Sequence, residues 1–220
     1  MRAVIISGGR ITDYAYIKSQ INESDTIICA DSGYDHAVKL GIKISAVVGD
    51  FDSISGSDSV SSFSSTCGYH SDNIPADIPI IRYPPHKDLT DTEIAIEYAR
   101  GKGFMDFLLL AATGGRMDHC LTNILLLKGF LERGETATII DEHSKIRLTN
   151  SKLCIHEAPG AIVSLVPLTD CDGVCTEGLA YPLHEANLRM GRGLGVSNIA
   201  VSQATVSLRK GLLLVIIARD

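Results

Sequence analysis

Carboxylates recur in the first half of this 220-residue sequence at points where short apolar runs end. Asp50 and Asp52 are two residues apart in Gly49-Asp50-Phe51-Asp52-Ser53, directly after a run that ends at Val48. Closely held carboxylates repel one another unless a cation or a proton intervenes. Mg²⁺ prefers oxygen ligands and commonly bridges carboxylates to phosphates. The pair therefore predicts a Mg²⁺ site that holds the phosphates of a nucleotide.

Four more acidic residues occupy comparable positions. They are Asp31 after a run ending at Ala30, Asp88 and Asp91 after one ending at Tyr83, and Asp118 after one ending at Ala112. Each has a simpler interpretation by itself, as a turn residue or as a carboxylate in the first turn of a helix. In an open parallel sheet, however, the strand exits share one edge, where ligands bind. Their joint occurrence favours a shared site.

Thr113-Gly114-Gly115-Arg116 lies between an apolar run and a helical pattern. Glycines at such a junction let backbone amides approach an anion, and an arginine adds a charged fork. The alternative is an ordinary tight turn. Other phosphate-binding and hydrolase motifs are missing from the sequence, which has no P-loop and no Gly-x-Ser-x-Gly elbow. The histidines show no metal-ligand spacing.

The elements that must position these residues alternate in type up to about residue 133. Strands are expected at 3–7, 26–30, 46–48, 78–83 and 107–112, and helices at 14–21, 35–40, 91–100 and 118–132. Thr90-Asp91-Thr92-Glu93 predicts a capping box at the start of the third helix. The Ser-rich stretch 53–65 suggests a surface loop or a weak helix. The pattern predicts an α/β domain with a parallel sheet.

From residue 134 onward the pattern changes to short strands. They are expected at 138–140, 161–166, 204–208 and 212–217, with Arg209-Lys210-Gly211 as a hairpin connection between the last two. Helix-length apolar periodicity is missing from this half. The sequence therefore predicts a domain at 1–133, which is α/β, and a second domain at 134–220, which is all-β.

Composition narrows the possible functions. A net charge of −6 argues against a protein that mainly grips nucleic acid, because phosphate binding needs a basic surface. The longest apolar runs are strand-sized, so no membrane span is expected. Six scattered cysteines give a poor zinc signal and are expected to be reduced, buried thiols. These features together favour a cytoplasmic protein.

The motifs in their order resemble those of the thiamine pyrophosphokinase family. The resemblance rests on Ala30-Asp31-Ser32-Gly33, Gly49-Asp50-Phe51-Asp52-Ser53, Lys87-Asp88-Leu89-Thr90-Asp91-Thr92-Glu93 and Gly114-Gly115-Arg116-Met117-Asp118-His119. It continues through Gly178-Leu179-Ala180-Tyr181-Pro182-Leu183, Gly195-Val196-Ser197-Asn198 and Lys210-Gly211-Leu212-Leu213. The four-motif series is specific, and the likeness covers nearly the whole chain.

This resemblance implies a Rossmann-like nucleotide-binding α/β domain, a β-sandwich-like domain that binds thiamine, and a homodimer. It implies the Mg²⁺-dependent transfer of the pyrophosphoryl group of ATP to thiamine, giving thiamine diphosphate and AMP. The implied roles are distributed as follows: Asp31, Asp50, Asp52 and Asp91 at the Mg²⁺–phosphate centre; Lys87, Asp88, Thr90, Thr113, Gly114, Gly115 and Arg116 with ATP; Ser197, Asn198 and Asp118 with thiamine. Asp50, Asp52, Asp91, Arg116 and Asp118 would form the catalytic group.

Two departures from the family pattern stand out. Ala-Asp-Gly-Gly, which is common in the family, reads Ala30-Asp31-Ser32-Gly33 here, which gives the backbone less freedom. Some members place a tryptophan against thiamine, and this chain contains none. The one aromatic residue after position 134, Tyr181, is expected to be a core residue. Two alternatives remain open: a pyrophosphokinase for another heterocyclic alcohol, or a nucleotide or thiamine sensor without catalysis.

Overall fold

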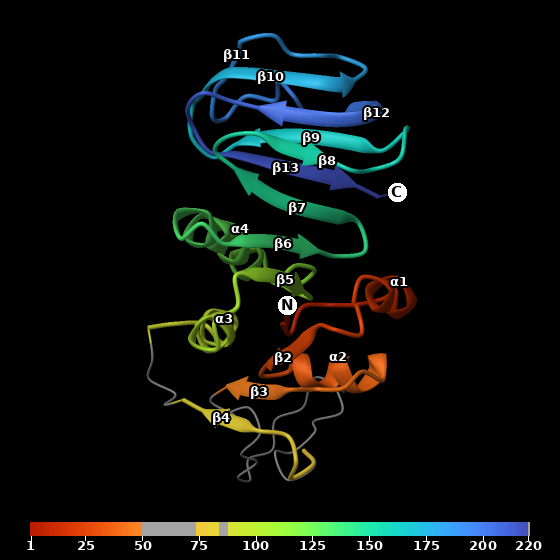
Figure 1. Cartoon of the computed structure of the whole chain (residues 1–220), viewed down its shortest axis with the longest axis vertical. Coiled ribbons are helices and arrows are strands. Elements are labelled where there is room, and N and C mark those ends of the chain that lie inside the picture. Colours follow the sequence, from red (N-terminus) through yellow and green to blue (C-terminus); the bar gives the residue numbers. More distant parts are fainter. Residues whose placement is uncertain (50–73, 84–87, 220) are drawn as a thin grey trace. The chain divides into compact units, whose positions relative to one another are not determined.

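The computed structural model describes residues 1–49, 74–83 and 88–219, which form a mixed α/β structure (Figure 1). Asp50, Asp52, Lys87 and the Ser-rich stretch 53–65 lie outside these residues. The chain divides into two compact units, Met1–Gly115 and Arg116–Asp220. A boundary after residue 133 stays a prediction about which parts of the chain fold independently.

The first unit contains a parallel sheet in the order β5-β1-β2-β3-β4. Its strands are β1 (Ala3–Ile6), β2 (Thr26–Ala30), β3 (Ala46–Gly49), β4 (Ile80–Arg82) and β5 (Asp106–Leu110). The central strands are apolar along their length and almost wholly buried, as expected of parallel strands whose two faces are both covered. The predicted strands and their parallel pairing are confirmed.

Among the described residues of this unit, three helices pack beside the sheet or one another: α1 (Tyr14–Ser19), α2 (Gly33–Leu40) and α3 (Asp91–Gly101). α2 packs on β1 and β2, and α3 packs on β1, β2 and β3. The predicted capping box at α3 is present: Glu93 donates its backbone N–H to Thr90 Oγ1 (3.3 Å), and its carboxylate accepts the Thr90 backbone N–H (2.9 Å). This cap fixes the residue at which α3 begins.

The strand order reverses direction between β1 and β5. Chain order runs outward from β1 through β2, β3 and β4, and then returns to β5 on the other side of β1. In open α/β sheets such a switch point leaves a crevice at the carboxyl ends of the strands, where ligands bind. The turns after β1 and β5 therefore border the favoured binding position of this unit.

The second unit opens with α4 (Met117–Glu132), which packs on β6 and β7. The strands are β6 (Thr136–Ile140), β7 (Ser144–Thr149), β8 (Leu153–Ile155), β9 (Ile162–Pro167), β10 (Cys171–Leu179), β11 (Ala186–Leu188), β12 (Asn198–Ser207) and β13 (Leu213–Ala218). They pair antiparallel in the order β6-β7-β13-β9-β12-β10-β11, with β8 on β12. The described residues after 134 form strands and no helix, as the sequence predicts.

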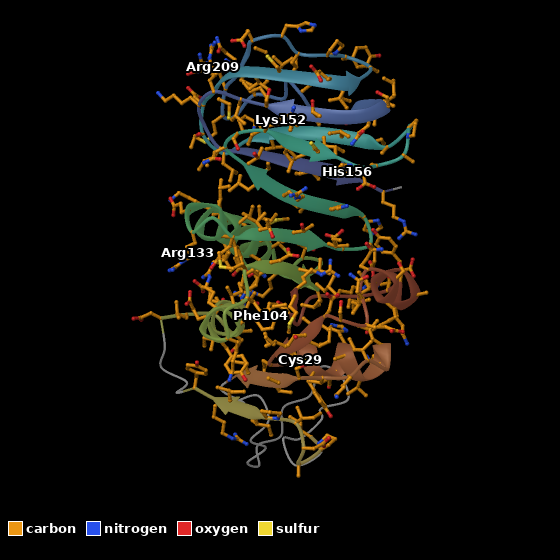
Figure 2. All side chains as sticks on the ribbon, viewed as in Figure 1. Cys29, Phe104, Arg133, Lys152, His156 and Arg209 are labelled. Atoms are coloured by element: carbon orange, nitrogen blue, oxygen red, sulfur yellow. The ribbon has the colours of Figure 1, made fainter. Side chains whose placement is uncertain are left out.

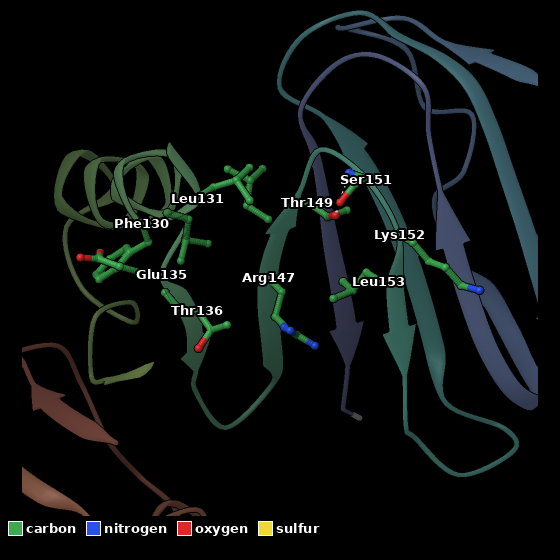
Figure 3. Close-up of a pocket in the computed structure, with 12 residues that line it drawn as sticks. Phe130, Leu131, Glu135, Thr136, Arg147, Thr149, Ser151, Lys152 and Leu153 are labelled. Atoms are coloured by element: carbon green, nitrogen blue, oxygen red, sulfur yellow. Dashed lines mark hydrogen bonds between the residues drawn. The ribbon is translucent and has the colours of Figure 1, made fainter. Parts of the chain in front are cut away.

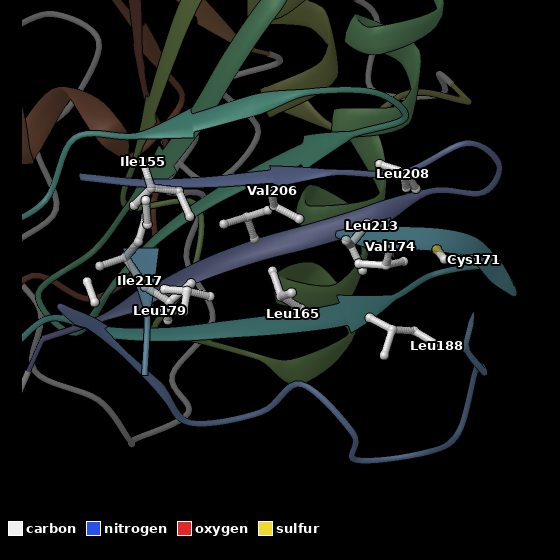
Figure 4. Packing of buried hydrophobic residues seen from close by; sticks show 14 residues of the cluster. Ile155, Leu165, Cys171, Val174, Leu179, Leu188, Val206, Leu208, Leu213 and Ile217 are labelled. Carbon is white, nitrogen blue, oxygen red and sulfur yellow. The ribbon is translucent and has the colours of Figure 1, made fainter. Parts of the chain in front are cut away.

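The core of these strands is a cluster of buried apolar side chains, most of them branched aliphatic (Figure 4). Alternate residues of β9 and β12 point into it, including Val163, Leu165, Ala204 and Val206. The alternation leaves the other face of each strand for solvent or a ligand.

The predicted hairpin at Arg209-Lys210-Gly211 is wrong. β12 and β13 are consecutive in the chain, yet β9 lies between them and pairs with both. Both edges of β13 are occupied, by β7 and β9. Lys210 instead pairs with Asp172, which donates its N–H to the Lys210 carbonyl (2.9 Å). Turn residues between two apolar runs mark a reversal of the chain and do not specify the strand that comes next.

The expectation that the cysteines are reduced and buried is confirmed only in part. Cys29 is buried in β2 (Figure 2), and burial raises the pKa of its thiol to about 12. Cys171 is buried as well, but Cys154 is exposed, so the expectation of uniformly buried thiols is wrong. All five cysteines in the described residues are free. Within the described residues, no helix has the length and apolar character needed to cross a membrane.

Candidate functional site

Asp31 lies where β2 leaves the sheet, beside the end of β3. Its backbone N–H donates to the Val48 carbonyl (2.8 Å), and a Cβ on Gly49 would lie 3.4 Å from the Asp31 Cα. Asp31 is half-buried and adopts a φ of 44°, a left-handed conformation in which Asp is enriched. The carboxylate is thus presented next to the strand that precedes Asp50 in the sequence.

The start of α3 is tied to the end of β1. Thr92 Oγ1 and Ser7 Oγ form a buried hydrogen bond of 2.9 Å. Asp91, the first residue of the helix, is half-buried beside this contact in the sequence, and Asp88 is exposed. The hydroxyl of Thr90 already serves the capping box, because it also donates to the Glu93 carboxylate (2.9 Å). Its predicted contact with ATP would need this bond to be shared.

The turns after β1 and β5 interlock at the switch point. The Gly9 N–H donates to the Ala111 carbonyl (2.7 Å), and a Cβ on Gly9 would lie 2.1 Å from the Thr113 carbonyl oxygen. Gly114, at φ 82°, packs in turn against the Arg10 carbonyl. Only glycine permits this approach of two backbones. The first turn, Ser7-Gly8-Gly9, is absent from the predicted site residues, although two glycines directly after an apolar strand are a visible signal.

Of the residues predicted to bind ATP at this junction, Thr113 is buried, while Gly114 and Gly115 are exposed. A Cβ on Gly115 would meet nothing within 4 Å. The backbone at Gly114 and Gly115 is therefore accessible at the position where parallel α/β sheets bind ligands. This placement fits, but does not test, the predicted phosphate contact.

Arg116 and Asp118 form an ion pair at the N-terminal end of α4. Arg116 Nε donates to Asp118 Oδ1 (3.1 Å), Nη2 donates to Oδ2, and the His119 N–H donates to Oδ1 (3.0 Å). The Arg116 guanidinium, through these bonds, lowers the pKa of the Asp118 carboxyl to about 2. Asp118 is thus a poor proton acceptor near neutral pH. Both side chains are exposed, so solvent also reaches the pair.

Ser197 and Asn198 lie at the start of β12, and their side chains differ in environment. Ser197 is exposed at φ 60°, and its N–H donates to Ser164 Oγ (2.9 Å). Asn198 is buried; its Oδ1 accepts the Tyr181 N–H (3.0 Å), and its Nδ2 donates to the Tyr181 carbonyl (2.7 Å). The Asn198 amide is therefore engaged with the backbone of Tyr181.

Tyr181 is 71% exposed. The expectation that it is a core residue is therefore wrong, because the Asn198 contacts hold its backbone where the side chain faces solvent. Further apolar side chains are exposed in the neighbouring sequence around Ser197, at Leu194, Val196 and Ile199. Exposed aromatic and aliphatic side chains of this kind are common at binding surfaces. The apolar Tyr-Pro-Leu sequence alone gave no sign of this exposure.

The carboxylate oxygens of Asp31 and Asp91 suit a hard cation such as Mg²⁺. Within the described residues, no three His, Cys, Asp or Glu side chains are grouped closely enough to hold a metal ion. The predicted metal ligands also include Asp50 and Asp52, which lie outside those residues. The donor chemistry fits the ion, and the ligand set stays a prediction.

The second unit contains a hollow of about 160 Å³ (Figure 3). It is bordered by α4, β6, β7 and β8 and is lined by Leu127, Phe130, Leu131, Glu135, Thr136, Ala137, Arg147, Leu148, Thr149, Ser151, Lys152 and Leu153. Of the predicted site residues that the structure describes, none contributes to it. In Figure 3 the Lys152 ammonium points away from Phe130 and Leu131. We therefore do not place the candidate site here.

Two family descriptions match the chain in succession. Residues 17–139 match "Thiamin pyrophosphokinase, catalytic domain", and residues 150–213 match "Thiamin pyrophosphokinase, vitamin B1 binding domain". The chain is 26% identical over 220 residues to thiamine pyrophosphokinase of Bacillus subtilis, with 98% of each chain covered.

Solved structures show the same likeness. The crystal structure of the Bacillus subtilis thiamine pyrophosphokinase matches with a TM-score of 0.82 and 25% identity, covering all of both chains. That of thiamin pyrophosphokinase from Geobacillus thermodenitrificans matches in fold with a TM-score of 0.80 and 24% identity, covering 100% of this chain and 98% of the other.

Proposed function

The chain belongs to the thiamin pyrophosphokinase family, and we propose that it transfers the pyrophosphoryl group of ATP to the hydroxyl of thiamine in a Mg²⁺-dependent reaction. The products are thiamine diphosphate and AMP. The observation that carries the proposal is the succession of a catalytic and a vitamin B1 binding match along one chain. In the first of these segments, Asp31 directly follows β2, and Asp50 follows β3 in the sequence, where β2 and β3 are parallel neighbours.

ATP binds, in this proposal, to the first unit at the β1/β5 switch point. The exposed backbone of Gly114 and Gly115 contacts its phosphates, with Lys87, Asp88 and Thr90 nearby in the sequence. Asp31, Asp50, Asp52 and Asp91 would hold Mg²⁺, which supplies neutralisation of phosphate charge. The interlocked turns support this role, because a rigid backbone holds the phosphates without reorganisation during the reaction.

The second unit binds thiamine through Tyr181 and the turn at Ser197. Thiamine carries a cationic aromatic ring, and an exposed tyrosine offers it both stacking and cation–π attraction. Asn198 acts indirectly, since its amide holds the Tyr181 backbone. Tyr181 would thus take the place of the tryptophan that this chain lacks. The carboxylate of Asp118 adds attraction for the thiazolium charge.

In the reaction the thiamine hydroxyl oxygen bonds to the β-phosphorus as the bond from that phosphorus to the α–β bridging oxygen breaks. AMP departs with the bridging oxygen, and the hydroxyl proton is released. Such transfers depend mainly on positioning and charge stabilisation. Because Arg116 lowers the pKa of the Asp118 carboxyl to about 2, Asp118 is a weak base and is assigned, with Asp91, to orienting the thiamine hydroxyl, whose proton is released to solvent. The N–H groups of Arg116 that Asp118 leaves free complement the phosphate oxygens.

Three further features belong to this proposal. The units correspond to a Rossmann-like nucleotide-binding domain and a β-sandwich, the protein forms a homodimer, and it acts in the cytoplasm. The family resemblance supports the first two, and the thiols support the third. Light scattering on a size-exclusion column tests the second, because a dimer has twice the chain mass of 23.6 kDa.

A substrate screen separates the proposal from its two alternatives. Purified protein is incubated with ATP, MgCl₂ and one of a set of heterocyclic alcohols, and the nucleotides are separated by chromatography. The proposal predicts AMP with thiamine and little with the others. AMP with a different alcohol would favour another pyrophosphokinase. Binding of thiamine or ATP without any AMP or ADP would favour the sensor.

A further inference from the structure

His36 in α2 connects three parts of the first unit. Its Nε2 donates to the Gly9 carbonyl (2.7 Å), and its Nδ1 lies 2.8 Å from the hydroxyl of Tyr14, the first residue of α1. Because a carbonyl can only accept, the proton of the neutral ring is on Nε2, and Nδ1 accepts the Tyr14 hydroxyl. The ring therefore joins α1 and α2 to the turn after β1.

Gly9 passes this restraint to the turn after β5. His36 fixes its carbonyl, while its N–H is bonded to the Ala111 carbonyl. Gly9 also lies directly against the Thr113 carbonyl oxygen, because a Cβ added to Gly9 would be only 2.1 Å from that oxygen. A shift of Gly9 must therefore displace the backbone that leads into Gly114.

From this geometry we infer that His36 is a positioning residue for nucleotide binding, which acts through Gly9 on the Thr113-Gly114-Gly115 backbone. The inference deepens the proposed function and rests on its placement of ATP phosphates at this turn. His36 touches neither substrate in this scheme. Its effect is to keep the two turns at the switch point in one arrangement before ATP arrives, which lowers the ordering cost of binding.

The surroundings of His36 favour the neutral ring that this arrangement needs. The ring is half-buried, and burial lowers its pKa. Lys39 on α2 acts in the same direction, whereas Asp35 on α2 and the Gly9 carbonyl oppose it. Tyr14 faces the ring from α1, with the ring centroids 5.9 Å apart.

Three substitutions isolate the contact. His36→Leu removes both hydrogen bonds, and His36→Gln keeps a donor for the Gly9 carbonyl. Tyr14→Phe removes only the bond to Nδ1. The control is Ile17→Val in the buried face of α1, which weakens the packing of α1 and leaves Gly9 untouched. Thermal unfolding of each variant reports its stability.

Two readouts are measured in the presence of MgCl₂: the Kd of α,β-methylene-ATP by calorimetry, and KM and kcat for ATP and thiamine. His36→Leu should raise the Kd of the analogue and the KM for ATP about tenfold, because the net contribution of roughly one hydrogen bond is lost. The thiamine KM should stay within about twofold. His36→Gln should recover most of the affinity for the analogue. Tyr14→Phe should raise its Kd about threefold.

The inference is overturned if His36→Leu binds the analogue as tightly as wild type, if His36→Gln is as impaired as His36→Leu, or if Ile17→Val weakens binding equally. It is also overturned if the wild type does not bind the analogue. Wild-type protein that binds the analogue but forms no AMP with thiamine would contradict the proposed function instead, and the Kd series would still decide the role of His36.

Discussion

The side-chain amide of Asn198 spans the backbone of Tyr181, accepting its N–H at 3.0 Å and donating to its carbonyl at 2.7 Å. The same Oδ1 accepts the N–H of Ile199 (2.9 Å). A buried polar residue thus holds an exposed aromatic one. Asn198 therefore supports the backbone of Tyr181, and its predicted contact with thiamine stays a prediction.

Replacing Asn198 with alanine tests that support. The change leaves the N–H and carbonyl of Tyr181 without these partners, so we expect a loss of roughly 1–2 kcal/mol in the free energy of unfolding. The thiamine KM should rise about tenfold, because Tyr181 is no longer held, while the ATP KM stays unchanged. Steady-state kinetics and urea unfolding measure both. Asn187→Ala, at an exposed position in β11, is the control. An unchanged thiamine KM would show either that Tyr181 does not bind thiamine or that Asn198 does not hold Tyr181 in place.

The ring of Tyr181 can be tested separately. Tyr181→Leu removes an aromatic face worth about 0.5–2 kcal/mol to a cation, so the thiamine KM should rise roughly 3- to 30-fold. Tyr181→Phe and Tyr181→Trp keep the face and should remain within about threefold of wild type. Stability should hardly change in any of them, because the side chain is exposed. Equal KM values for the leucine and phenylalanine variants would exclude stacking.

Much of the first unit could be predicted from the sequence because its signals are local. Apolar runs marked the parallel strands, and Thr90 with Glu93 marked the start of α3. The exits of parallel strands necessarily share an edge, so Asp31 could be assigned to that edge before its contacts were known.

What could not be predicted depends on contacts distant in sequence. The position of β1 between β2 and β5 gives Gly9 its contact with Ala111, about a hundred residues away. Likewise, the backbone of Tyr181 is held by hydrogen bonds with Asn198, and β9 separates β12 from β13 although β12 and β13 are consecutive. Residue patterns indicate which segments form strands, but they do not give the partners of those strands.

The pKa of Asp118 provides a test of the Arg116 pair. In the wild type it should lie near 2, and in Arg116→Gln it should rise toward the ordinary value of 3.8, because the guanidinium that stabilises the charged form is gone. Carbonyl chemical shifts followed by NMR between pH 1.5 and 6 give both values. Arg133→Gln, at the other end of α4, is the control and should leave the pKa low. A wild-type pKa near 4 would contradict the pair and its assigned role.

The buried ring of His36 predicts a pH dependence of stability. Its pKa is lowered in the folded state, so the unfolded chain binds a proton first as pH falls. The wild type should therefore keep its full His36 contribution above about pH 6.5 and lose stability as pH falls below that value toward the folded pKa. His36→Gln, which does not titrate, should lack this component. Urea unfolding at pH 7.5, 6.5 and 5.5 measures the difference between the two proteins. If the unfolding free energies of the two proteins change in parallel with pH, burial does not lower the pKa of the His36 ring.

Asp52→Ala addresses the predicted metal ligands. Turnover should fall by about two orders of magnitude or more, because charge stabilisation at the phosphates is lost. The variant should unfold at a temperature close to that of wild type. Near-normal turnover at saturating MgCl₂ would remove Asp52 from the metal site. The affinity for Mn²⁺, measured from the relaxation of water protons, should fall as well. This measurement does not depend on activity.

The central claim is tested most directly by quantifying AMP and thiamine diphosphate together in a reaction of purified protein with ATP and MgCl₂, with and without thiamine. The account predicts the two products in a 1:1 ratio, AMP only when thiamine is present, and neither product with EDTA. ADP in place of AMP, or AMP that forms equally without thiamine, would contradict it.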